Sequence, residues 1–134
     1  MSKQKNILIT GAGGSIGSEL ARQVAVKGNN KIFLLDNSEL NLFNIFEELK
    51  SKNKDIVPLL IDLVDNDILN EFFSKNTIDT VYHVAAYKHV NMLQMNKYSA
   101  IKNNIIGTKN ILDAARNRVN FFTQVSTDKA VKPV

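Results

Sequence analysis

The chain has 134 residues and a formal net charge of +4, and 44% of its residues are hydrophobic and 22% are charged. This length and composition are typical of one globular domain and exclude a chain that is disordered throughout. The sequence has no cysteine, which excludes disulfides and thiolate metal sites, and its lysines do not cluster. We therefore expect neither a metal site nor nucleic acid binding.

Short apolar runs alternate with amphipathic segments along the chain. The first run, Ile7–Thr10, ends in a glycine-rich turn and is predicted to be a buried strand. The next segment, Ser15–Lys27, has apolar residues at four-residue steps, which is typical of one helical face, and Gly28 ends it. The same alternation of strand and helix continues through Lys31–Asp36, Ser38–Lys52, Ile56–Ile61, Asn66–Ser74, Thr80–Val84, Ser99–Arg116 and Asn120–Ser126.

This strict alternation predicts an α/β fold, in which helices cover both faces of a parallel sheet. With right-handed crossovers the expected strand order is 3-2-1-4-5, that of a Rossmann-type doubly wound sheet. A complete domain of this kind has at least one more strand. We therefore expect residues 1–134 to be a truncated domain from a longer protein, with the substrate lobe outside this chain.

The turn after the first strand carries the most informative local motif. Glycines there let the backbone turn sharply against a pyrophosphate, and the helix that follows offers N–H groups and a positive dipole end. The spacing of Gly11, Gly14 and Gly17 departs from G-x-G-x-x-G, which needs glycine in place of Ile16, and resembles the TGxxGxxG of extended short-chain dehydrogenases. An ordinary glycine-rich turn is the alternative. The residues predicted to bind the dinucleotide are Thr10, Gly11, Gly13, Gly14, Ser15, Ile16 and Gly17.

Two aspartates at strand ends fit the same interpretation. Asp36 ends the second strand, where a carboxylate accepts hydrogen bonds from an adenosine ribose and repels a 2′-phosphate, so NAD is favoured over NADP. The alternative for Asp36 is a helix cap that competes with Ser38. Asp62 follows the third strand and is predicted to hydrogen-bond the adenine while Leu63 packs on it, with a turn aspartate as the alternative.

Three segments of the second half are more specific still, and they read His83-Val84-Ala85-Ala86-Tyr87-Lys88-His89-Val90, Asn104-Ile105-Ile106-Gly107-Thr108 and Ser126-Thr127-Asp128-Lys129-Ala130. Together with the glycine motif they resemble the CapD-like polysaccharide-biosynthesis family, the UDP-N-acetylglucosamine 4,6-dehydratases. The resemblance implies a lyase in which hydride leaves C4 of the sugar for NAD(P)⁺. The C5 proton and the C6 hydroxyl are then lost as water, and the hydride returns to C6.

The resemblance also implies a role for each matching residue. Ala85 and Ala86 would line the cofactor path, Asn104 would support the site's geometry beside the cofactor, and Lys88 and His89 would lie near the substrate. Each has a plain alternative: packing for the alanines, a helix-surface amide for the asparagine, and ordinary loop side chains for the other two.

The last motif supplies the expected catalytic residues. Thr127 would lie by the nicotinamide ribose and the C4 hydroxyl, Asp128 would protonate the departing C6 hydroxyl, and Lys129 would take the C5 proton as a neutral amine. A strand-end hydroxyl and a turn ion pair are the alternatives. The family's YxxxK motif does not follow Asp128 here, so we expect this NAD(P)-binding chain to catalyse little or nothing by itself.

Other functions share this scaffold. A sugar C4-epimerase or reductase is the alternative among enzymes, although neither needs a C6 acid or a C5 base. A non-catalytic dinucleotide-binding module is the alternative from another class. For the whole protein the resemblance implies a UDP-sugar substrate, a homo-oligomer and a cytoplasmic location, and it leaves attachment to the inner face of the membrane open.

Overall fold

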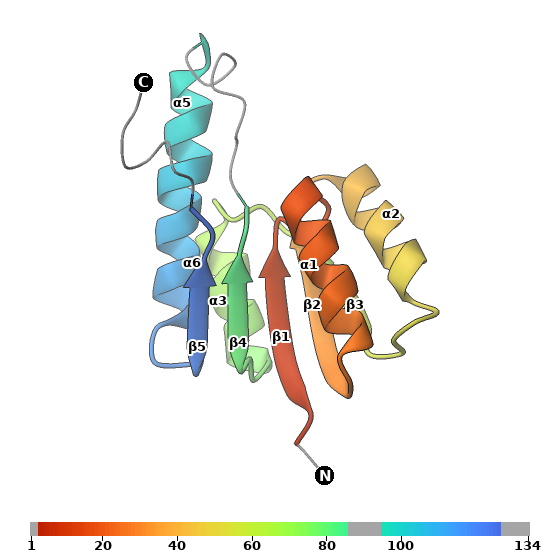
Figure 1. Ribbon diagram of the computed structural model, residues 1–134. Coiled ribbons are helices and arrows are strands. Elements are labelled where there is room, and N and C mark those ends of the chain that lie inside the picture. The colour runs from red at the N-terminus through yellow and green to blue at the C-terminus, as the bar shows by residue number, and fades with distance from the viewer. Residues whose placement is uncertain (1–2, 86–94, 127–134) are drawn as a thin grey trace.

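The computed structural model describes residues 3–85 and 95–126 (Figure 1). Its strands are β1 (Lys5–Thr10), β2 (Asn30–Asp36), β3 (Ile56–Leu60), β4 (Thr80–His83) and β5 (Phe121–Gln124). Its helices are α1 (Ser15–Val26), α2 (Glu39–Leu49), α3 (Asn66–Lys75), α5 (Lys97–Ala100) and α6 (Thr108–Ala115), with a π-helical segment η1 (Ile101–Gly107) between the last two.

The five strands form one sheet in the order β3-β2-β1-β4-β5, and every neighbouring pair is parallel. Both the Rossmann-type fold and the strand order predicted from the sequence are confirmed. Consecutive strands β1 to β3 run outward on one side, and β4 then crosses to the other side of β1. The carboxyl ends of β1 and β4 therefore flank the point where the strand order reverses, which is where ligands bind in open α/β sheets.

The alternation of side chains along the central strands builds two hydrophobic layers. In β1, Ile7 and Ile9 face one layer while Leu8 faces the other, because successive residues of a strand point to opposite faces. The first layer is completed by α1 and α2 and the second by α3 and α6. Figure 1 shows these two pairs of helices on opposite faces of the sheet. Burial on both faces explains why the strands read as continuous apolar runs.

One predicted helix differs in its winding. The periodicity indicated a single α-helix over Ser99–Arg116, whereas the structure winds Ile101–Gly107 as a π-helix and begins α6 at Thr108. A π-helical turn has more residues per turn than an α-helix, so it rotates the side chains that follow it. The last strand is also shorter than the predicted Asn120–Ser126, and its Phe121 is 65% exposed at the sheet edge.

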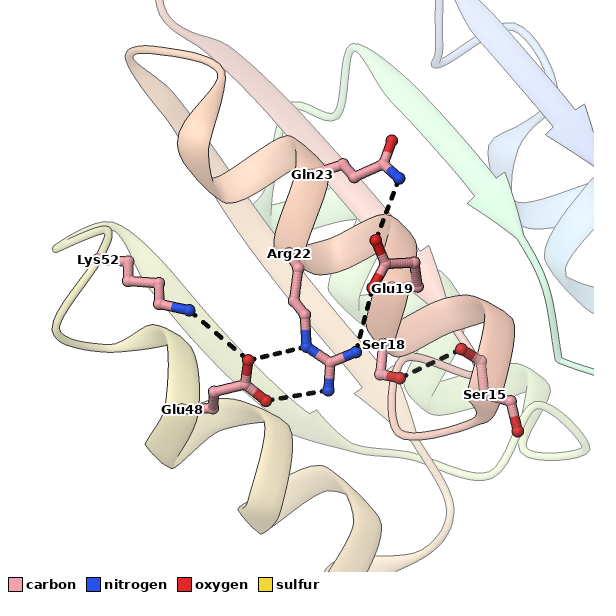
Figure 2. Close-up of polar contacts among 7 residues, drawn as sticks. All are labelled: Ser15, Ser18, Glu19, Arg22, Gln23, Glu48 and Lys52. Atoms are coloured by element: carbon pink, nitrogen blue, oxygen red, sulfur yellow. Dashed lines mark hydrogen bonds and ion pairs between the residues drawn. The ribbon is translucent and has the colours of Figure 1, made fainter.

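A surface network joins the two helices of the first layer (Figure 2). Arg22 of α1 donates from Nε and Nη2 to the two carboxylate oxygens of Glu48 on α2, at 2.8 and 3.0 Å. These bonds lower the pKa of Glu48. Lys52 approaches the same carboxylate at 3.6 Å, and Glu19 pairs with Arg22 at 3.3 Å. The contact links α2 to α1 on the surface. Because its side chains are exposed, it adds little to the free energy of unfolding.

In residues 3–85 and 95–126, no helix is long and apolar enough to cross a membrane.

Candidate functional site

The glycine motif forms a tight turn from β1 into α1. Gly11 has φ of +67°, a left-handed conformation that favours glycine, and a Cβ there would lie 2.8 Å from the Cα of Ala85. A Cβ at Gly17 would lie 2.0 Å from the carbonyl oxygen of Gly11, so the helix start can approach the turn only without a side chain. Gly14 is less confined, because its Cβ would meet only this same oxygen, at 3.3 Å.

The start of α1 differs from the starts of α2 and α3. Ser38 and Asp65 cap those two helices by accepting hydrogen bonds from backbone N–H groups, and each first turn also carries an acidic residue. The cap position of α1 is Gly14, which has no side chain, and the first turn of α1 has no acidic residue. This helix therefore presents its positive end to the glycine turn without a protein carboxylate or hydroxyl cap, as an anion-binding helix does.

Asp36 lies at the end of β2 and holds the glycine turn. Its carboxylate is buried and accepts one hydrogen bond from the backbone N–H of Gly13 at 2.9 Å and another from that of Ser38 at 2.9 Å. Ser38, and not Asp36, caps α2, so the alternative of Asp36 as the helix cap does not hold. Each carboxylate oxygen keeps a further acceptor position, which leaves the predicted hydrogen bonds to a ribose chemically open.

The predicted adenine residues lie on the turn between β3 and α3. Asp62 is exposed, and its Oδ1 accepts a hydrogen bond from the backbone N–H of Val64 at 3.0 Å, as a turn aspartate does. Leu63 is only 4% exposed and packs in the second hydrophobic layer, so its side chain contributes to the core. An open depression of about 600 Å³ beside this turn is lined by Asp62, Val64, Asp65, Asn66, Asp67 and Lys102. The adenine contact itself stays a prediction.

A buried histidine links the glycine turn to the last helix. The sequence did not predict this role for it. His83 ends β4 and is 2% exposed; its Nδ1 lies 2.7 Å from Oγ1 of Thr10, and its Nε2 lies 2.9 Å from Oγ1 of Thr108. The only signals available in the sequence were a polar residue within an apolar strand and its place in a motif of the resembled family.

The proton on this imidazole can be assigned from its neighbours. The backbone N–H groups of Val84 and Ala85 both donate to the hydroxyl oxygen of Thr10, at 3.3 and 3.4 Å. That hydroxyl has its own proton left to give, so it donates to Nδ1 of His83. The ring proton is then on Nε2 and donates to Thr108. Because the ring is buried without a charged partner, its pKa is lowered from 6.5 to about 4.

The remaining predicted residues fall into two groups. Ala85 packs against the second layer beside Gly11, and Asn104 lies half-buried in η1, where its side-chain oxygen accepts a hydrogen bond from Asn103 at 3.0 Å. Six further predicted residues lie outside the described ranges, and their roles stay predictions: Ala86, Lys88, His89, Thr127, Asp128 and Lys129.

The structure therefore brings a glycine turn, an uncapped helix start and two strand-end aspartates to one edge of the sheet. Such an edge can hold a pyrophosphate together with the ribose and base of the adenosine attached to it. Among the residues described, no group of three or more histidine, aspartate or glutamate side chains could hold a metal ion.

Comparison with known proteins gives consistent matches. Residues 7–134 match the model of a family described as polysaccharide biosynthesis protein. The chain is 42% identical over 133 residues to the capsular polysaccharide biosynthesis protein CapD of Staphylococcus aureus, with 96% of this chain and 22% of that protein aligned. It is 35% identical over 137 residues to the inverting UDP-N-acetylglucosamine 4,6-dehydratase of Campylobacter jejuni, covering 100% of this chain and 40% of that enzyme.

Among solved structures, the X-ray structure of Pen from Bacillus thuringiensis superposes with a TM-score of 0.88 at 33% identity. The match covers 98% of this chain and 40% of that one. The chain thus spans less than half the length of these relatives.

The glycine turn predicts that two alanine substitutions differ in their effect on the free energy of unfolding. Gly17→Ala places a Cβ 2.0 Å from the Gly11 carbonyl, and we expect it to cost about 2 kcal/mol or more in free energy of unfolding, as overpacking does. Gly14→Ala is the matched control, and because its Cβ has room we expect a change within about 1 kcal/mol. Urea unfolding of both variants measures the difference, and equal stabilities would contradict the geometry.

The buried histidine predicts a stability loss in weak acid. The pKa of His83 is lowered in the folded state, so the unfolded state binds the proton first. The histidine's contribution is therefore complete above pH 6.5 and is lost as the pH falls toward about 4. At about 1.4 kcal/mol per pKa unit, the full loss is about 3 kcal/mol. In His83→Gln, which keeps a donor and an acceptor, urea unfolding should show a shallower pH dependence across this window. An unchanged slope would refute the assignment.

Proposed function

The chain belongs to the polysaccharide biosynthesis protein family, and on that premise we propose that it is the NAD-binding portion of a nucleotide-sugar 4,6-dehydratase. The observation that carries the proposal is the start of α1, a helix whose cap is a glycine and whose first turn has no acid. Pyrophosphate oxygens would complete its hydrogen bonds, and the open side of Gly14 leaves room for them.

The chain's own residues would hold the adenosine end of the cofactor. The carboxylate of Asp36, already oriented by Gly13 and Ser38, would accept hydrogen bonds from the adenosine ribose diol and would repel a 2′-phosphate. The exposed carboxylate of Asp62 would accept from the adenine. NAD is therefore the proposed cofactor, and NADP the weaker ligand. When bound, the nicotinamide would accept a hydride from the sugar and return it.

The proposed substrate is a UDP-sugar, with UDP-N-acetylglucosamine first. The relatives support this class, because one that is 35% identical to the chain is a UDP-N-acetylglucosamine 4,6-dehydratase. The chain spans only 40% of that enzyme, so dehydration is proposed for the whole protein and not for residues 1–134 alone. In it Thr127 would lie by the C4 hydroxyl, Lys129 would remove the C5 proton, and Asp128 would donate a proton to the departing C6 hydroxyl.

Calorimetric titration of the 134-residue chain tests the cofactor proposal. We expect saturable binding of NAD⁺ and weaker binding of NADP⁺, because in the proposed site the Asp36 carboxylate would repel a 2′-phosphate. Gly14→Val should abolish binding while the circular dichroism spectrum is retained, since its methyl groups would occupy the pyrophosphate's place. Equal or tighter binding of NADP⁺ would contradict the role of Asp36. Normal binding of NAD⁺ by Gly14→Val would show that the phosphate site lies elsewhere.

The acid and base roles are tested in the whole protein. Lys129→Met and Asp128→Asn should each lower formation of the 4-keto-6-deoxy product by about 10²- to 10⁴-fold, the usual contribution of a general acid or base. Solvent deuterium exchange at C5 separates the two, because Asp128→Asn leaves the base in place and should permit exchange, whereas Lys129→Met should not. Unchanged formation of this product by both variants would show that Asp128 and Lys129 are not the acid and the base.

A further inference from the structure

The first residues of α6 contact the turn that carries Asp62. The side-chain amide of Asn110 is half-buried and donates to the backbone carbonyl of Leu63 at 3.0 Å and to that of Val64 at 3.2 Å. One primary amide thus uses both of its N–H donors on two consecutive carbonyls. Neither carbonyl belongs to a strand or a helix, so Asn110 takes the place of a secondary-structure partner for each.

A glycine lets the helix backbone pack closely against the same turn. Gly107 is buried at the junction of η1 and α6, and a Cβ there would lie 3.1 Å from the Cβ of Leu63. The helix backbone therefore approaches the turn more closely than an alanine would comfortably allow. This approach brings Asn110, three residues further on, within reach of the two carbonyls.

The hydrogen bonds within the turn are local and few. The backbone N–H of Val64 donates to the carboxylate of Asp62, and that of Asp65 donates to the carbonyl of Asp62 at 2.9 Å. Both orient Asp62 relative to its own turn but do not fix the turn relative to the sheet. The start of the turn is attached to β2, because the backbone N–H of Ile61 donates to the carbonyl of Asp36 at 3.1 Å, and the buried side chain of Leu63 and the amide of Asn110 attach the rest.

We propose that Asn110 is a positioning residue that sets the Asp62 carboxylate for recognition of the adenine amino group, an inference that rests on the dinucleotide site proposed above. Asn110 acts through the backbone: it holds the carbonyls of Leu63 and Val64, and the N–H of Val64 in turn holds Oδ1 of Asp62. The second carboxylate oxygen of this exposed side chain would then serve as the acceptor for the adenine. Without the amide, the turn would keep its local bonds and the buried Leu63 but lose the two hydrogen bonds that hold its carbonyls against α6.

Thr108, two residues before Asn110, connects α6 to the glycine turn through His83. Its hydroxyl receives the ring proton of His83, and His83 in turn receives the hydroxyl proton of Thr10 at the start of the glycine turn. The first turn of α6 is therefore bonded to both predicted cofactor segments, by separate side chains. Substitution of Asn110 should affect the adenine end alone.

The test compares two dinucleotides that differ at one exocyclic group. The 134-residue chain, Asn110→Ala and Asn110→Asp would each be titrated with NAD⁺ and with nicotinamide hypoxanthine dinucleotide, in which an oxygen replaces the adenine amino group. Asn70→Ala is the matched control, because the Asn70 amide donates to a backbone carbonyl 2.9 Å away inside α3 and touches no turn carbonyl.

We expect the unsubstituted chain and Asn70→Ala to prefer NAD⁺. In both Asn110 variants, affinity for NAD⁺ should fall about three- to tenfold, the effect of one misplaced hydrogen bond, while affinity for the hypoxanthine analogue hardly changes. Retained preference in the Asn110 variants, or an equal loss of affinity for both ligands, would overturn the positioning role. Equal binding of both ligands by the unsubstituted chain would also overturn it and leave the dinucleotide site standing. Binding of neither ligand would refute the proposed function itself.

Discussion

The carbonyl of Gly11 lies where any side chain at position 17 would have to be, and the geometry of the candidate site depends on that contact. Because α1 can start directly against the turn, its N-terminal end comes to the carboxyl edge of the sheet, beside the end of β1. Asp36 then holds the turn from the side of β2, through the N–H of Gly13. The strand end, the turn and the helix start thus form one unit, and a displaced turn would carry the N-terminal end of α1 with it.

On the other face, α6 serves the same edge of the sheet by polar contacts. Its inner side chains Ile111, Ala114 and Ala115 are packed in the second layer, while Thr108 and Asn110 of its first turn reach a histidine and two carbonyls. The helix is therefore anchored by burial along its length and oriented by hydrogen bonds at its start. The π-helical segment before it gives Gly107 its close approach to Leu63, which links an irregular winding to the position of a loop.

Much of this fold could be predicted because the signals are local. Alternating apolar runs and amphipathic segments gave the strand order, and the glycine spacing located the turn. The partners of His83 could not be predicted, since they lie 73 and 25 residues away and only the packed sheet brings them together. Nor could the winding of Ile101–Gly107, because a seven-residue π-helix and an α-helix present nearly the same apolar pattern. The place of Asp36 at a strand end predicts a ligand role, but its hydrogen bond from Gly13 depends on tertiary contact and could not be predicted.

The double attachment of Asp36 has a consequence for how coenzyme preference could evolve in this chain. The same carboxylate that would meet the ribose also accepts hydrogen bonds from the N–H of Gly13 and that of Ser38. A mutation of this acid to a neutral or basic residue would therefore change the charge beside the proposed ribose site and also release the glycine turn. A lineage that shifts toward the phosphorylated coenzyme would first need another acceptor for Gly13. A change of preference would thus require compensating changes in the turn itself.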